Sequence, residues 1–182
     1  MTLFDKFKSG DPLLLAAKLI VGFAIGIMIF AMVMIGLGLG ALATVERAEI
    51  IGQLAKVGAP ANMAWLVAAA LALALGLLFL GVRFMIELFG IMDTVGTGDP
   101  FAPENGSRLS RMGWLAIGAQ GIALALKGVV KVLEPYAIKA GKPIDLEFDL
   151  DMSGVLLVLI LFILARVFRH GATMRADLEG TV

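Results

Sequence analysis

The polar residues with the potential for chemistry are few, and they lie near or within long apolar stretches. Arg83 and Glu87 stand four residues apart, on one face of a helix. Gln120 is the strongly polar residue near the middle of a later apolar stretch, where we expect it to hydrogen-bond across helices. Charged groups at membrane depth are costly and usually face a partner or a cavity. An intrahelical Arg83–Glu87 pair whose charged ends reach toward water is favoured here over a transport site.

Composition argues against catalysis and against a metal centre. The 182 residues include no cysteine and one histidine, His170, so neither a nucleophile–base set nor a zinc, copper or haem site can be assembled. The acids between Asp145 and Asp151 alternate, without the spacing of a calcium loop, which leaves at most a weak divalent-ion site. The formal net charge is zero, and there is no basic stripe for nucleic acid. We expect no enzyme, no cofactor and no direct nucleic-acid binding.

Four apolar stretches predict an all-α integral membrane protein. The chain is 60% hydrophobic with a mean hydropathy of +0.96, and about 20 apolar residues suffice to cross a bilayer as a helix. Lipid offers the backbone no hydrogen-bond partner, so the spans must be helices. We predict one domain over 1–182, a four-transmembrane-helix bundle. Its spans are about 12–44, 61–92, 112–134 and 153–170, and 171–182 form a cytoplasmic tail.

The distribution of basic residues predicts the orientation of the spans. Loops on the cytoplasmic side carry an excess of Lys and Arg. With both termini inside, the cytoplasmic residues outnumber the outer ones, Arg47, Lys56, Lys127, Lys131, Lys139 and Lys142. The cytoplasmic set is Lys6, Lys8, Lys18, Arg83, Arg108, Arg111, Arg166, Arg169 and Arg175. We therefore expect a multi-pass membrane protein with both termini, and the loop before the third span, in the cytoplasm.

Two outer connections and two glycine pairs indicate packing contacts. Residues 45–58 predict a short amphipathic helix, and 143–151 alternate apolar and acidic residues like an extended strand. The strand either caps its own bundle or pairs with another subunit, so a homo-oligomer stays open. Gly22 and Gly26, and Gly36 and Gly40, form G-x-x-x-G pairs, for which we expect ordinary packing within the bundle.

The connection before the third span, GTGDPFAPENGSRLSRMGW, is richer in turn formers than a plain loop requires. Asp99 can bond the following backbone and Pro100 fixes its own torsion, while Phe101 is expected to plug the inner mouth of the bundle.

The start of the third helix follows in the same stretch. We expect Asn105 or Ser107 to cap that helix, and Arg108 and Arg111 to lie at the level of the lipid phosphates.

The C-terminal segment, LARVFRHGATMRADLEGTV, is also patterned, and the predicted topology puts it on the same side as this loop. Asp99 and Glu104 are therefore expected to pair with Arg166, Arg169 or Arg175.

These two stretches carry a resemblance to a bacterial four-helix membrane family known only as domain of unknown function 2975. It extends over essentially the whole chain, with a G-x-P-F…N…R-L-R loop and an F-R-x-G…L/M-R-x-x…T-V ending. The resemblance implies a multi-pass protein of the bacterial cytoplasmic (inner) membrane. The matching residues are Gly98, Pro100, Phe101, Asn105, Arg108, Leu109, Phe168, Arg169, Gly171, Met174, Arg175, Thr181 and Val182. Met174 stands where leucine is expected. The family implies no activity, but its members are often encoded beside a small helix-turn-helix regulator of the Xre type.

Three functional hypotheses follow. The favoured one is a membrane-embedded binding or sensor protein whose cytoplasmic loop and tail engage a partner, the resemblance pointing to a helix-turn-helix transcription regulator. The alternative is a small transporter, channel or toxin-immunity protein, which would need a polar path across the bundle. A membrane enzyme acting on lipid is the least favoured, because no catalytic constellation is present.

Overall fold

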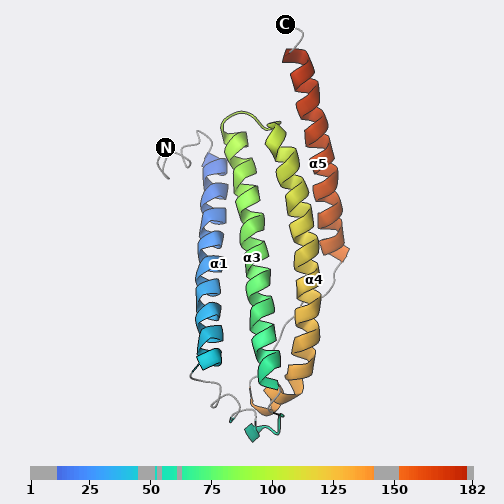
Figure 1. Cartoon of the computed structure of the whole chain (residues 1–182). Coiled ribbons are helices and arrows are strands. Elements are labelled where there is room, and N and C mark those ends of the chain that lie inside the picture. Colours follow the sequence, from blue (N-terminus) through green and yellow to red (C-terminus); the bar gives the residue numbers. More distant parts are fainter. Residues whose placement is uncertain (1–11, 45–51, 53–54, 61–62, 142–151, 180–182) are drawn as a thin grey trace. The chain divides into compact units, whose positions relative to one another are not determined.

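The chain forms four long helices. A computed structural model describes residues 12–44, 52, 55–60, 63–141 and 152–179. Within them lie α1 (Pro12–Thr44), α3 (Met63–Gly96), α4 (Pro103–Lys139) and α5 (Met152–Glu179), shown in Figure 1. All four are long and apolar enough to cross a membrane. The fold is therefore the expected all-α four-helix bundle of a multi-pass membrane protein.

Two helices extend further than the apolar stretches indicated. The helix α4 begins at Pro103 rather than near Met112, because proline is well suited to the first position of a helix, where no backbone N–H is needed. The expected cap at Asn105 or Ser107 is therefore wrong, since both lie inside the helix. The helix α5 continues to Glu179, so the segment from 171, expected as a tail, is helical as far as that residue.

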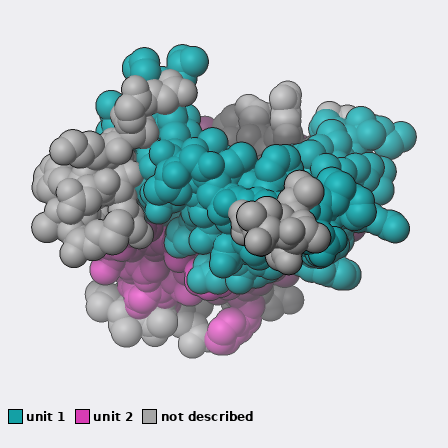
Figure 2. Space-filling model, turned by 90° about the horizontal axis from the view of Figure 1, so that it is seen from above, with its two compact units in different colours: residues 1–28, 80–118, 151–182 teal, residues 29–79, 119–150 magenta. Residues whose placement is uncertain are grey.

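The chain divides into two compact units, coloured separately in Figure 2. Unit 1 comprises residues 1–28, 80–118 and 151–182, and unit 2 comprises 29–79 and 119–150. Unit 1 thus holds the first part of α1, the last part of α3, the first part of α4 and all of α5. Both patterned polar segments of the sequence belong to it. In unit 2, α3 and α4 approach closely at Gly76, where an added Cβ would lie 3.4 Å from Ile122 Cδ1.

The core of unit 1 forms between α4 and α5. Leu109, Met112 and Ala116 of α4 and Leu161 and Ala165 of α5 are buried together. Many other apolar side chains of the helices are exposed. Those of α5 include Val155, Leu156, Leu157, Leu159, Ile160, Ile163 and Leu164. In a membrane protein such side chains contact lipid, which is as apolar as they are.

Three of the four paired glycines of α1 do not lie in close contact with another helix. A Cβ added at Gly26, Gly36 or Gly40 would meet no atom within 4 Å. The expected packing role is wrong for these three residues. Glycines that do admit a close neighbour lie instead on α3, α4 and α5, as described below.

Two predicted outer features fall mainly outside the described residues. The proposed strand at 143–151 does so entirely. Of the proposed amphipathic helix at 45–58, residues 52, 55 and 56 are helical and a turn follows at 57–58.

Candidate functional site

The α3–α4 loop, residues 97–102, begins at a well-formed helix end. The N–H of Gly98 donates to the carbonyl of Val95 and the N–H of Asp99 donates to that of Thr94, each at about 3 Å. These paired bonds define a Schellman motif, which satisfies carbonyls that the last turn of a helix otherwise leaves unpaired. The motif needs a left-handed residue, and Gly98 supplies it with a φ of 87°. The chain therefore leaves α3 in one defined direction.

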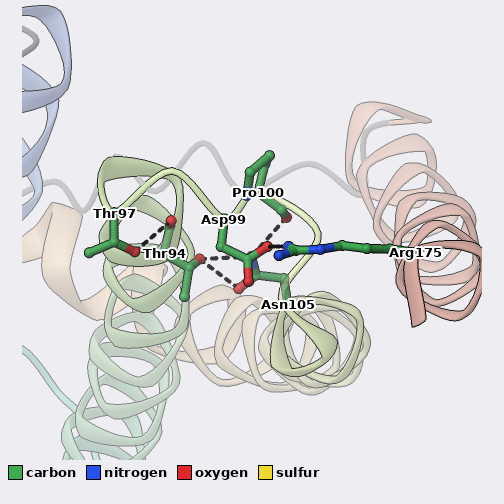
Figure 3. Close-up of polar contacts among 6 residues, drawn as sticks. All are labelled: Thr94, Thr97, Asp99, Pro100, Asn105 and Arg175. Carbon is green, nitrogen blue, oxygen red and sulfur yellow. Dashed lines mark hydrogen bonds and ion pairs between the residues drawn. The ribbon is translucent and has the colours of Figure 1, made fainter. Parts of the chain in front are cut away.

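Asn105 fixes the other side of this loop and is completely buried. Its Nδ2 donates to the hydroxyl of Thr94 at 2.7 Å and to the carbonyl of Pro100 at 3.0 Å (Figure 3). The Thr94 hydroxyl in turn donates to the carbonyl of Ile91 at 2.8 Å. One side chain on α4 thus binds both the end of α3 and the middle of the loop.

Arg108 completes the connection between α3 and α4. Its Nη1 donates to the carbonyl of Gly90 at 2.6 Å and to Oδ1 of Asn105 at 3.2 Å. A Cβ added at Gly90 would lie 2.9 Å from Cζ of Arg108, so the guanidinium occupies space that only glycine leaves open. The arginine expected at the phosphate level is therefore engaged within the protein.

The loop also rests against the aqueous half of α5. The rings of Phe101 and Phe168 lie 5.5 Å apart between centroids, and a Cβ added at Gly171 would stand 2.7 Å from Cδ1 of Phe101. Nη1 of Arg175 donates to Oδ1 of Asp99 at 2.5 Å (Figure 3). The expected pairing of loop and C-terminal segment is confirmed for Asp99 and Arg175. Phe101 remains 43% exposed on the flank of α5, so the expected plug is wrong.

Close backbone contact between α4 and α5 supports this arrangement. A Cβ added at Gly106 would lie 2.5 Å from Cγ of Arg169 and 3.2 Å from the carbonyl oxygen of Ala165. Gly106 is therefore needed for α5 to approach the first turns of α4.

Two further ion pairs connect the helices of unit 1. Nζ of Lys18 lies 3.1 Å from Oδ1 of Asp93, and the lysine side chain is only 4% exposed. Nη2 of Arg111 lies 3.1 Å from Oε2 of Glu87. Glu87 thus pairs with α4, and the expected intrahelical pair with Arg83 is wrong. Helix rotation, which spacing along one helix cannot reveal, decides which basic residue the carboxylate faces.

The remaining predicted residues take no part in the hydrogen bonds and ion pairs described above. Arg83 is exposed on α3. Gln120 belongs to unit 2, outside the site. Arg166 and Arg169 are exposed on α5.

The sequence analysis did not predict that Lys18, Asp93 and Thr94 take part in the polar contacts of this site. Asp93 and Thr94 directly precede the GTGDPF turn, and an acid with a threonine at the end of an apolar helix is a signal that was available. Lys18 offered a second signal, because a lysine six residues inside an apolar helix needs a partner.

An open groove of about 1220 Å³ runs along α5 beside Phe101. Its lining combines apolar side chains with basic ones, among them Arg166, Arg169, His170 and Arg175. The described residues contain no group of three or more His, Asp or Glu that could hold a metal ion. What the arrangement offers chemically is binding, through charge and apolar contact.

Comparison with known proteins identifies a family without a described activity. Residues 52–182 match the family described as "Protein of unknown function (DUF2975)". No curated protein and no solved structure gives a significant match. The match includes both the α3–α4 loop and α5, the segments on which the resemblance was recognised.

Proposed function

The chain belongs to this family of unknown function, and we propose that it is a membrane-embedded binding or sensor protein whose α3–α4 loop and α5 together dock a partner. The observation that carries the proposal is the fixed packing of that loop on α5. A loop that merely joined two spans would need no fully buried Asn105, no close contact at Gly171 and no ion pair between Asp99 and Arg175. Such preorganisation lowers the entropic cost of binding.

The exposed side chains of this surface suggest the kind of partner that binds it. Phe101 and Met174 are 43% and 52% exposed, and an aromatic beside basic residues is a typical anchor of a protein interface. The complementary partner presents apolar side chains with acidic neighbours. We propose a small helix-turn-helix transcription regulator, the class that the family resemblance implies.

The proposed partner requires the loop to face the cytoplasm. The Lys and Arg distribution supports that orientation, with both termini inside a bacterial inner membrane. The chain has no native cysteine, so one cysteine at the exposed Glu104 provides a topology assay. An impermeant thiol reagent applied to intact cells should leave this cysteine unlabelled and label it after the membrane is opened. Labelling in intact cells would exclude a cytoplasmic partner.

Site-specific crosslinking tests the docking surface. A photoreactive phenylalanine analogue replaces Phe101 in the full chain in cells, with the 58% exposed Ile138 of unit 2 as the control position. We expect a crosslinked helix-turn-helix regulator from position 101 only, and a lower yield when Asn105→Ala loosens the loop. The same products at both positions, or lipid adducts alone at position 101, would refute the proposal.

A transport function is the alternative, and the buried charges of unit 1 are what favour it. Lys18 and Glu87 are 3% and 8% exposed, as the polar groups of a path would be. Each already has a partner, which favours a structural role. Ion flux in reconstituted vesicles that is abolished by Glu87→Gln or Gln120→Leu would support transport over docking.

A further inference from the structure

One face of α5 combines apolar and basic side chains in a defined order. Ile163, Arg166, Val167, His170 and Met174 follow the i, i+3, i+4, i+7, i+11 spacing of a single helical face. All five line the groove beside Phe101. The face therefore carries apolar and basic side chains in turn along the helix axis, from Ile163 at one end to Met174 at the other.

The length of this face corresponds to the boundary of a bilayer. Ile163 and Val167 are 61% and 53% exposed and follow the lipid-facing residues of α5. At 1.5 Å per residue, the seven steps from Ile163 to His170 span about 10 Å. The headgroup layer on each side of a bilayer is roughly 5–7 Å thick. When Ile163 contacts acyl chains, Arg166 and His170 thus lie at headgroup depth.

Two arginines of the groove have no carboxylate partner within the part of the chain that the structure describes. Lys18, Arg111 and Arg175 each contact an acid, whereas within the described residues neither Arg166 nor Arg169 does. Both guanidinium groups carry a permanent charge and a planar set of donors that suits a phosphate. Their complement is an anion at the membrane surface.

We propose that this groove is a binding site for an anionic phospholipid. The phosphate of the lipid lies between the guanidinium groups of Arg166 and Arg169 with His170 beside it, and an acyl chain follows Ile163 and Val167. The groove, at about 1220 Å³, has room for a headgroup and the first part of a chain. The site differs from the protein-docking surface in its ligand, and it does not depend on the partner proposed above.

Lipid retention by the purified full chain tests this site. The protein in mild detergent is incubated with equal amounts of phosphatidylglycerol and phosphatidylcholine, and the bound lipids are counted by native mass spectrometry. The double variant Arg166→Gln with Arg169→Gln removes two positive charges from the groove. Its control, Lys131→Gln with Lys139→Gln, removes two positive charges from unit 2. Each basic residue near a membrane surface strengthens anionic lipid binding several-fold, so the groove variant should bind phosphatidylglycerol roughly 30-fold more weakly. The control should bind as the wild type does.

A second variant and one competitor keep the result decisive. Arg166→Lys with Arg169→Lys keeps the charge, so it should retain the preference for phosphatidylglycerol at reduced affinity. Equal loss in the control, or no preference for phosphatidylglycerol in the wild type, would overturn the proposal. So would displacement by millimolar glycerol phosphate, which would identify a free phosphate site. Loss of a crosslinked protein at Phe101 with unchanged lipid binding would assign these arginines to protein docking instead.

Discussion

Replacing Asn105 with alanine should open the α3–α4 loop while leaving the four helices formed. The side chain donates to Thr94 and Pro100 and accepts from Arg108. Its Oδ1 also lies 3.1 Å from the Thr94 hydroxyl. Each hydrogen bond is worth about 1 kcal/mol net, and a buried group left without its partner costs more. The loss of stability is moderated because Arg108 keeps its hydrogen bond to the carbonyl of Gly90. Thr94 likewise keeps its hydrogen bond to the carbonyl of Ile91. We therefore expect the opening free energy of the loop to fall by about 2–4 kcal/mol.

Thiol labelling converts this free energy into a rate. Ala102 is 6% exposed and the chain has no native cysteine, so Ala102→Cys reacts only when the loop opens. When opening and closing are fast compared with labelling, the rate follows the population of the open state. A change of about 3 kcal/mol then raises the labelling rate on the order of 10²-fold.

The control is Ser107→Ala, two residues further along α4. Its hydroxyl makes one exposed bond to the carbonyl of Glu104 at 2.7 Å, so labelling of Ala102→Cys should change less than about threefold. Equal labelling rates with and without Asn105→Ala would refute the assignment of Asn105 as the residue that holds the loop. Circular dichroism must show unchanged helix content, since global unfolding would raise labelling for a different reason.

Three further substitutions distinguish packing, buried charge and exposed charge by thermal unfolding in detergent. Gly106→Ala should cost about 1–3 kcal/mol, because the added methyl would meet α5 at van der Waals overlap. Asp93→Asn should cost roughly 1–3 kcal/mol, since it removes the carboxylate charge that faces the 4% exposed Lys18 side chain, and the 34% exposure of Asp93 admits some water. Asp99→Asn should cost less than about 1 kcal/mol, because its pair with Arg175 is largely exposed. Equal losses for Asp93→Asn and Asp99→Asn would contradict the argument from burial.

Much of the fold could be predicted because a membrane imposes strict rules on sequence. The long apolar stretches had to be helices, and the bounds of α1 agreed with the expected span. The start of α4 was placed too late because its first two turns carry polar residues, which an argument from hydropathy assigns to a loop. Proline at position 103 was the local signal for the true start.

The site was partly predictable, for reasons that differ between its residues. The pairing of Asp99 with Arg175 followed from charge and topology, since the two segments lie at the same end of the protein. Glu87 was assigned the wrong partner, because the rotation of α3 about its axis decides whether it faces Arg83 or Arg111. The rotation depends on packing details such as the close contacts at glycines, which no periodicity reveals.

The unbroken course of α5 from Met152 to Glu179 gives the protein a mechanical lever. Arg175 lies ten residues beyond the buried Ala165, about 15 Å along the helix axis. A change of bilayer thickness that tilted α5 by 10° would displace that arginine by roughly 3 Å. Because Nη1 of Arg175 and Oδ1 of Asp99 lie 2.5 Å apart, a displacement of this size would break their ion pair unless the α3–α4 loop moved together with α5.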